Sequence, residues 1–327
     1  MKSPVLAIDL GGTKILAALV SNRKVEFRDY SPTCAEEGPE AVVNNIYEAI
    51  GRVLVNSGLD LKQLHSIAIA AAGAIDTKRG IVTMSPNLPG WRNVHLTDKI
   101  KNKYPVDVFL TNDANAAAVG EHRYGAGRST KDMLYITVST GIGGGIIIDN
   151  KIYEGASGGA GEIGHMSIDI NGPKCNCGNT GCWETLASGT ALAREAIKRI
   201  ERGEKSLLTE MVNGNIDDIT AREVGEAAEK DDKLALACIN QIAVYFGIGL
   251  VSLIDIFNPE AIVIGGGLTN LGDRLFGPAK EIVRERAFPL PAGAAKIVPA
   301  QLGDEAGIIG AVVWAKKQKP AMPLLKS

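Results

Sequence analysis

Apolar and polar positions follow two different periods along the chain, and the change between them predicts its elements. Two short apolar runs, 5–9 and 15–20, stand on either side of Gly11 and Gly12, which is typical of a strand, a glycine turn and a second strand. We expect further strands at 66–71, 106–110 and 261–264, and helices at 39–57, 114–124, 187–202, 221–230, 234–257, 272–287 and 306–316. Strands that alternate with helices indicate an α/β fold.

The opening hairpin has a near copy later in the chain. Residues 133–153 (MLYITVSTGIGGGIIIDNKIY) align without a gap with residues 5–25 (VLAIDLGGTKILAALVSNRKV), and both read as strand, Gly/Thr turn and strand. Identities are few, so we interpret this as a repeated hairpin rather than as a duplication. Because 327 residues exceed the usual size of one hydrophobic core, we expect two lobes that each open on this hairpin.

Composition narrows the expected partners and location. The net charge is −2 and the pI is about 6.2, which argues against a dedicated binder of nucleic acid or membrane surfaces. The N-terminus lacks the pattern of a signal peptide, and the longest apolar run, 242–257, is interrupted by Asp255 and falls short of a membrane span. We therefore expect a buried helix there and a cytoplasmic protein, in which thiols stay reduced.

The two glycine turns are candidates for binding anionic oxygens. DLGGTK (9–14) lacks the Walker A spacing, and STGIGGG (139–145) runs into a strand rather than a helix, so neither is a nucleotide fingerprint of those kinds. Each can direct backbone N–H groups and a hydroxyl, of Thr13 or Thr140, at a phosphate. An ordinary hairpin is the alternative for either turn alone, but two matching turns favour a phosphate held between lobes. Asp9 and Lys14 carry charges suited to a Mg²⁺–phosphate group.

Residues 155–159, GASGG, formally match the G-x-S-x-G motif of hydrolases. A nucleophile elbow needs a strand before the serine and a helix after it, and this stretch has glycine on both sides. We interpret the match as a coincidence.

Asn112 and Asp113 end an expected strand and begin an expected helix. Both residue types are preferred helix N-caps, which is the simpler interpretation. The alternative is a carboxylate at the carboxyl edge of a sheet, where a helix N-terminus keeps Asp113 ionised and able to accept a proton from a hydroxyl.

A histidine and three cysteines lie close together in the stretch 164–184. Three thiolates and one imidazole form a closed tetrahedral set of the kind that holds structural zinc, and we favour this over free thiols or a disulfide. The expected ligands are His165, Cys175, Cys177 and Cys182.

Two glutamates frame this cluster. Glu162 precedes His165 by three residues, and Glu184 follows Cys182 by two. If a metal ion holds the segment, both carboxylates can face a common polyol, whereas solvated surface charge is the alternative. His165 can ligate zinc through one ring nitrogen and offer the other to a substrate hydroxyl.

These motifs together resemble the ROK family of sugar kinases and repressors, within the actin-like ATPase superfamily, with glucokinases as the subgroup that looks closest. The resemblance covers DLGGTK, SPNLPGW (85–91), TNDAN (111–115), STGIGGG, GEIGHM (161–166), CNCGNTGCWETLASG (175–189) and VIGGGL (263–268). It implies a two-lobed, ribonuclease H-like α/β fold with an interlobe cleft and a structural zinc site. The expected lobes are 1–112 with 306–327, and 113–305 with the zinc segment 165–182.

The resemblance also implies roles for matching residues. Asp113 would be the general base for phosphoryl transfer from Mg-ATP to the 6-hydroxyl of glucose. The sugar would be bound by Gly73, Asn87, Asn112, Asp113, Glu162, His165 and Glu184, and ATP by Asp9, Gly11, Gly12, Thr13, Lys14, Thr140, Gly141, Gly266 and Gly267. AAGAID (71–76) departs from the family pattern, in which a proline often precedes the glycine.

Other functions remain open at this point. N-acetylglucosamine or N-acetylmannosamine is the alternative substrate, and a homodimer or homotetramer is expected. A sugar-responsive repressor needs a DNA-binding helix-turn-helix before the lobes, and a phosphate hairpin that begins at residue 5 leaves no room for it. We therefore expect a hexose and ATP as partners, and neither nucleic acid nor a membrane.

Overall fold

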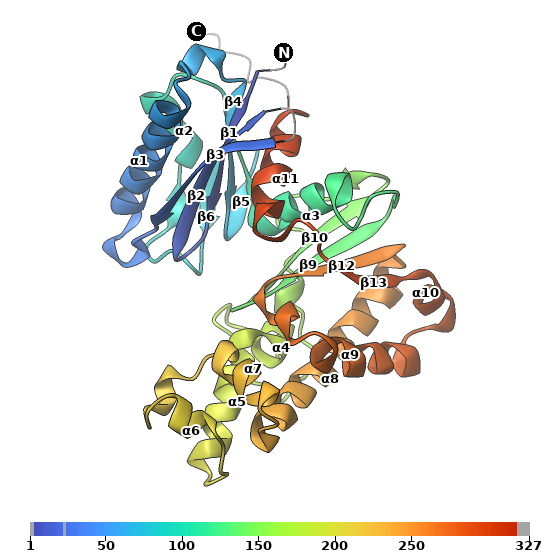
Figure 1. Cartoon of the computed structure of the whole chain (residues 1–327). Helices are drawn as coiled ribbons and strands as arrows, with labels where there is room; N and C mark the ends of the chain where they lie inside the picture. The colour runs from blue at the N-terminus through green and yellow to red at the C-terminus, as the bar shows by residue number, and fades with distance from the viewer. Residues whose placement is uncertain (1–2, 22–23, 319–327) are drawn as a thin grey trace. The chain divides into compact units, whose positions relative to one another are not determined.

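The computed structural model describes residues 3–21 and 24–318, which form two compact units (Figure 1). The first unit contains the chain up to Ser129, Gly145–Gly161 and the chain from Gln301. The second contains Thr130–Gly144 and Glu162–Ala300. The expected lobes, 1–112 with 306–327 and 113–305, and the cleft between them stay predictions.

A five-stranded sheet of order β3-β2-β1-β4-β8 organises the first unit. Its strands are β1 (Val5–Leu10), β2 (Lys14–Ser21), β3 (Lys24–Pro32), β4 (Ser66–Ala71) and β8 (Val108–Asn112). Strands β1, β4 and β8 are parallel, and Leu10, Ala71 and Asn112 lie side by side in register at their carboxyl ends. This edge therefore carries Asp9, the first glycine turn and Asn112–Asp113, and it is the edge at which open α/β sheets bind ligands.

The two faces of this sheet are covered by different helices. Successive side chains of β1 therefore point alternately into two separate hydrophobic cores. Leu6 and Ile8 pack in one core with α1 (Pro39–Ser57) and α2 (Leu96–Lys103). Val5 and Ala7 pack in another with α3 (Asp113–Tyr124) and α11 (Ala306–Ala315). A small second sheet of order β5-β6-β7 consists of Ala74–Asp76, Ile81–Met84 and Arg92–Val94, and short 3-10 helices lie at Ala35–Glu37 and Leu61–Gln63.

The second glycine turn lies between β9 (Met133–Val138) and β10 (Ile142–Ile148), in a sheet of order β11-β10-β9-β12-β13. The other strands are β11 (Lys151–Ile152), β12 (Ala261–Gly265) and β13 (Lys296–Pro299). The helices of the second unit are α4 (Trp183–Ala187), α5 (Gly189–Glu201), α6 (Leu208–Met211), α7 (Ala221–Glu229), α8 (Lys233–Phe257), α9 (Asp273–Arg286) and α10 (Pro289–Ala294). Both glycine turns thus join paired antiparallel strands, as their sequences predict.

Two expectations about elements need correction. The helix expected at 187–202 is broken at Ser188, whose hydroxyl accepts a hydrogen bond from Ala191 N and begins α5 after the short α4. The apolar run 242–257, which we expected to be too short to span a membrane, belongs to α8. This helix has 25 residues and is, by length and composition only, long and apolar enough to span a membrane. Within its unit α8 packs against α4, α5, α7 and α9 and buries Leu250 and Ile254, so the buried helix is confirmed.

Candidate functional site

The first glycine turn, Gly11–Thr13, leaves backbone donors without partners. Gly11 N donates to Lys14 O at 3.1 Å, whereas the N–H groups of Gly12 and Thr13 make no hydrogen bond to any described residue. A Cβ on Gly12 would lie 2.8 Å from Asn87 O, so only glycine fits there. The turn therefore has the open N–H groups that an anionic oxygen requires, and it contacts the predicted sugar residue Asn87.

Two partly buried carboxylates lie beside this turn. Burial and the like charge of Asp113 raise the pKa of Asp9 to about 7, although Lys14 acts to lower it. Burial also raises the pKa of Asp113, which opens α3 and accepts a hydrogen bond from Ala114 N at 2.8 Å. Lys14 is exposed and pairs with Asp304 at 3.5 Å. The two carboxylates favour binding of a proton or a cation between them, because the negative charge of one makes ionisation of the other less favourable.

Asn112 caps α3, so the simpler interpretation of this residue is confirmed. Its Oδ1 accepts from Asn115 N at 3.0 Å, and its Nδ2 donates to Gly73 O at 3.0 Å. Gly73 has φ +115°, and a Cβ there would lie 2.4 Å from Met84 O. The structure thus brings Gly73, Asn112 and Asp113 together, because the Asn112 amide also forms a hydrogen bond with the Asp113 carboxyl, which acts to lower the pKa of that group.

The four predicted metal ligands form one cluster in the second unit. Their donor atoms, on His165, Cys175, Cys177 and Cys182, all lie within 4.8 Å of one another. The distance from His165 Nδ1 to Cys175 Sγ is 3.6 Å, and that from Cys177 Sγ to Cys182 Sγ is also 3.6 Å. A tetrahedral ion with 2.3 Å bonds to sulfur separates two sulfurs by about 3.8 Å, so the set fits a metal such as zinc. None of the five cysteines forms a disulfide, so that alternative is removed.

The two ring nitrogens of His165 lie near different groups. Its Nδ1 lies among the thiols, whereas its Nε2 is 4.0 Å from Glu162 Oε2. The two nitrogens can therefore serve a metal ion and a polar ligand at the same time, as the sequence predicts.

Glu184 connects the cysteine segment to the second glycine turn. Its Oε2 accepts a hydrogen bond from Ile142 N at 2.9 Å, and a Cβ on Gly141 would lie 2.2 Å from the same oxygen. The neighbouring Trp183 is fully buried, stacks on Phe246 at 5.3 Å and donates to a backbone oxygen of α8. This anchoring fixes the carboxylate of Glu184 and leaves its second oxygen for a ligand.

A cavity of about 640 Å³ in the second unit begins at the second glycine turn. Of the predicted nucleotide residues, Thr140 and Gly267 line it. Gly266 packs against the backbone of β9 instead, where a Cβ would lie 2.4 Å from Val138 O. The sequence prediction missed most of the other lining residues, which include Thr190, Thr220, Ala221, Gly225, Leu271 and Arg274.

The missed residues come from separate helices, so no local motif reports them together. One signal was available: Thr220 and Glu223 form a capping box, which marks the start of α7, and this helix start lines the cavity.

The model of the ROK family matches residues 5–318. The chain belongs to the ROK family. A glucokinase from Thermotoga maritima is 36% identical to it, over 97% of this chain and 98% of its own. The crystal structure of a ROK family glucokinase from Streptomyces griseus, in complex with glucose and AMPPNP, is 35% identical with a TM-score of 0.84 and covers 96% of this chain and 100% of its own.

The family also contains regulators. A xylose repressor from Caldicellulosiruptor bescii is 32% identical over 98% of this chain but only 79% of its own length. The two-lobed α/β fold of the ROK sugar kinases is thus the fold of this chain, and the resemblance inferred from its motifs is confirmed.

Proposed function

We propose that the protein is an ATP-dependent glucokinase, which transfers the γ-phosphoryl group of ATP to the 6-hydroxyl of glucose. The observation that carries this proposal is the placement of Asp113 and Asp9 beside a glycine turn with unpaired N–H groups. The similarity to glucokinases along nearly the whole chain supports it.

In this proposal Asp113 is the general base. It takes the proton of the sugar hydroxyl as the new bond from oxygen to phosphorus forms and the bond to the leaving ADP oxygen breaks. Its raised pKa suits this task, because a base whose pKa approaches the working pH accepts a proton with less loss of driving force. The α3 N-terminus fixes the direction of the carboxylate through Ala114 N.

We assign further sugar contacts within each unit. In the first unit we assign Gly73, Asn87 and the amide of Asn112 to sugar hydroxyls; in the second we assign Glu162, His165 Nε2 and the second carboxylate oxygen of Glu184. Carboxylates and an imidazole suit a polyol because they accept hydrogen bonds from hydroxyl groups.

The nucleotide takes the two glycine turns and the 640 Å³ cavity. We assign the phosphates to the turns at Gly11–Thr13 and Thr140–Gly141, and the nucleoside to the cavity. Asp9 and Lys14 provide the charges that accompany Mg-ATP. Because phosphoryl transfer depends mainly on positioning and charge neutralisation, these groups need only hold the phosphate chain in line with the hydroxyl.

We assign zinc to the cluster of His165 and the three cysteines. Zinc would brace the segment that presents Glu162, His165 and Glu184, and a closed set of four protein ligands leaves it no position for a reacting water. A homodimer or homotetramer stays a prediction from the family resemblance, and a cytoplasmic location stays a prediction from the sequence.

A coupled ADP-release assay tests the proposal. With glucose, mannose, fructose, N-acetylglucosamine and N-acetylmannosamine as acceptors, we expect the highest kcat/KM for glucose. A higher value for an N-acetylhexosamine would assign the second candidate substrate. Absence of sugar-dependent ADP release with every acceptor would overturn the proposal.

A further inference from the structure

Thr33, immediately after β3, holds both ends of the first glycine turn. Its Oγ1 donates to Gly11 O at 2.8 Å, and its backbone N donates to Thr13 O at 2.9 Å. The side chain is fully buried, at 0% exposure. One residue outside every motif therefore fixes two of the carbonyl groups in the turn.

These two bonds set the direction of the N–H groups on the other side. A peptide unit is planar and trans, so its C=O and the following N–H point in opposite directions. When Gly11 O is bound to Thr33, the N–H of Gly12 points away from Thr33, and this N–H has no partner among the described residues. The Gly11–Gly12 peptide lies between two residues without a Cβ, so it has little steric resistance to flipping. A flipped peptide would present Gly11 O to a phosphate instead of the N–H.

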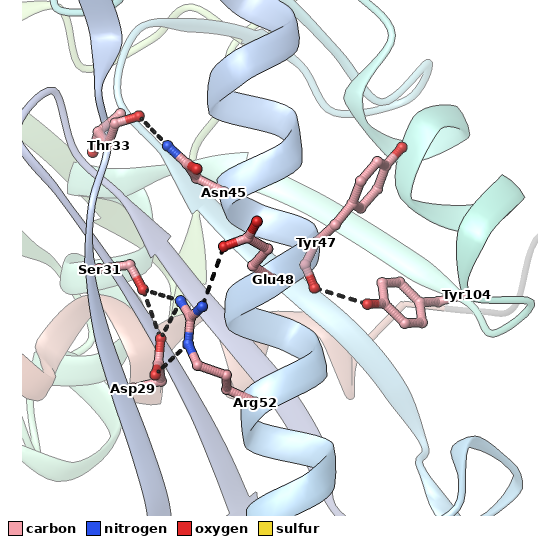
Figure 2. A network of polar contacts seen from close by, with 8 residues as sticks. All are labelled: Asp29, Ser31, Thr33, Asn45, Tyr47, Glu48, Arg52 and Tyr104. Atoms are coloured by element: carbon pink, nitrogen blue, oxygen red, sulfur yellow. Dashed lines mark hydrogen bonds and ion pairs between the residues drawn. The ribbon is translucent and has the colours of Figure 1, made fainter.

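Thr33 is in turn tied to helix α1. Figure 2 shows Asn45 Nδ2 donating to Thr33 O, at 3.1 Å. Further along β3, Arg52 of α1 bonds both carboxylate oxygens of Asp29, at 2.9 and 3.1 Å, and also Ser31 (Figure 2). The strand that carries Thr33 is thereby fastened to α1 at two levels.

We infer that Thr33 is a positioning residue for the phosphate group, which acts by holding the Gly11–Gly12 peptide with its N–H directed at the nucleotide. This rests on the proposed kinase function, in which that turn binds ATP. Thr33 touches neither substrate, and Asn45 supports it from α1.

The variant Thr33→Val tests the inference, because valine keeps the shape and removes the hydroxyl. Loss of one hydrogen bond predicts a rise in the KM for ATP of roughly two- to tenfold, with a fall in kcat and an unchanged KM for glucose. Thr33→Ser restores the hydroxyl and should restore the KM for ATP. A purely structural role would move both KM values together and would not distinguish the nucleotide.

A second pair of variants keeps the test valid if Thr33→Val folds poorly. Asn45→Ala removes the bond to Thr33 O and should raise the KM for ATP in the same direction by a smaller factor. Tyr47→Phe is the matched control: it lies two residues away on α1 and loses a hydroxyl that donates to Lys99 O at 2.8 Å, remote from the turn. It should leave the KM for ATP at the wild-type value.

The outcomes separate this inference from the proposed function. If wild-type protein shows no sugar-dependent ADP release, the proposed function fails and the inference with it. If the wild type is active and Thr33→Val or Asn45→Ala folds with an unchanged KM for ATP, the inference alone is wrong. Equal effects of Tyr47→Phe and Asn45→Ala would also overturn it.

Discussion

Asp9 and Asp113 are acidic side chains whose placement opposes their own ionisation. Their pKa values rise because both are desolvated at the sheet edge and because the charge of Asp113 acts on Asp9. A raised pKa of this kind lowers the free energy of unfolding at neutral pH, since the unfolded chain ionises freely and the folded chain does not. Such a cost is typical of residues kept for function.

Asp9→Asn should therefore stabilise the fold while it impairs activity. The native pKa of Asp9 is about 7 against an ordinary 3.8, so the cost grows as the pH rises from about 4 to 7 and is complete at pH 8. We expect the Tm of Asp9→Asn to exceed that of wild type by about 2 °C or more at pH 8 and the difference to shrink at pH 5, measured by differential scanning fluorimetry.

Asp29→Asn provides a control of opposite sign for Asp9→Asn. Hydrogen bonds from Arg52 lower the pKa of Asp29, so its stabilisation is present above the ordinary pKa and is lost as the pH falls through the lowered one. The Tm of Asp29→Asn should lie below wild type at pH 8, by an amount that shrinks in acid. A lower Tm for Asp9→Asn at pH 8 would contradict our interpretation of Asp9.

Asp113→Asn should nearly abolish turnover. Loss of a general base costs roughly 10²–10⁴-fold in kcat, whereas the amide preserves the size of the side chain and the start of α3. Steady-state kinetics should show this fall, whereas the circular dichroism spectrum should stay close to wild type and much of the affinity for glucose should remain. A near-normal kcat would remove Asp113 from the role of base.

At the scale of single residues, the sequence alone identified the side chains with distinctive chemistry. His165 and the three cysteines form the predicted cluster because their ligand types and spacing identify them without knowledge of the fold. Thr33 could not be identified from the sequence, because its role depends on a contact with Gly11, which is 22 positions away in the chain. The residues of the cavity, such as Thr220 and Arg274, were missed for the same reason.

Helices and strands could be predicted where burial of one face gives a regular spacing of apolar residues in the sequence. The bounds of α1 and β4 agree with their predictions, and both elements place apolar residues in the core. Strand β3 was not predicted, because it lies at the sheet edge and most of its side chains are exposed, so it has no regular apolar pattern. Strand β8 begins two residues later than predicted and brings Asn112 to the strand end.

The segment with the predicted metal ligands contains little regular structure between the short 3-10 helix Ile163–His165 and α4. The variant Cys177→Ser should therefore lose zinc and release His165 from its fixed position. We expect a fall in bound zinc by elemental analysis and a Kd for glucose at least about tenfold weaker by calorimetry, which corresponds to about 1.4 kcal/mol.

Cys238→Ser is the control for Cys177→Ser. Cys238 is buried in α8, outside the cluster, and its replacement should leave the zinc content unchanged. Wild-type glucose affinity in a zinc-free Cys177→Ser protein would refute the bracing role of the metal.

At the scale of the whole molecule, the chain passes repeatedly from one compact unit to the other. Within the first unit, Glu121 binds two of the segments that lead into or out of these connections. Its side chain is fully buried and accepts hydrogen bonds from Ala126 N, Gln301 N and Leu302 N at 2.7–2.9 Å. Ala126 precedes the crossing at Ser129, and Gln301 begins the return. The sequence could not reveal this, because a glutamate late in an expected helix has the ordinary pattern of a surface residue.

Glu121→Ala should destabilise the protein by about 2 kcal/mol or more, because it removes a fully buried carboxylate and leaves three part-buried N–H groups without their acceptor. Glu121→Gln retains one acceptor oxygen and should cost less. Glu226→Ala, which removes an exposed ion pair with Arg222, should cost under about 1 kcal/mol. Urea denaturation measures all three, and a Glu121→Ala effect as small as that of Glu226→Ala would refute this role.

Trp183 gives the protein an optical probe at a useful place. Its indole is shielded from solvent and stands in the chain between Cys182, a predicted metal ligand, and the carboxylate of Glu184. The other two tryptophans, Trp91 and Trp314, belong to the first unit. In a protein with those two replaced by phenylalanine, the emission of Trp183 would report loading of the metal segment and engagement of a sugar in real time, without any attached dye.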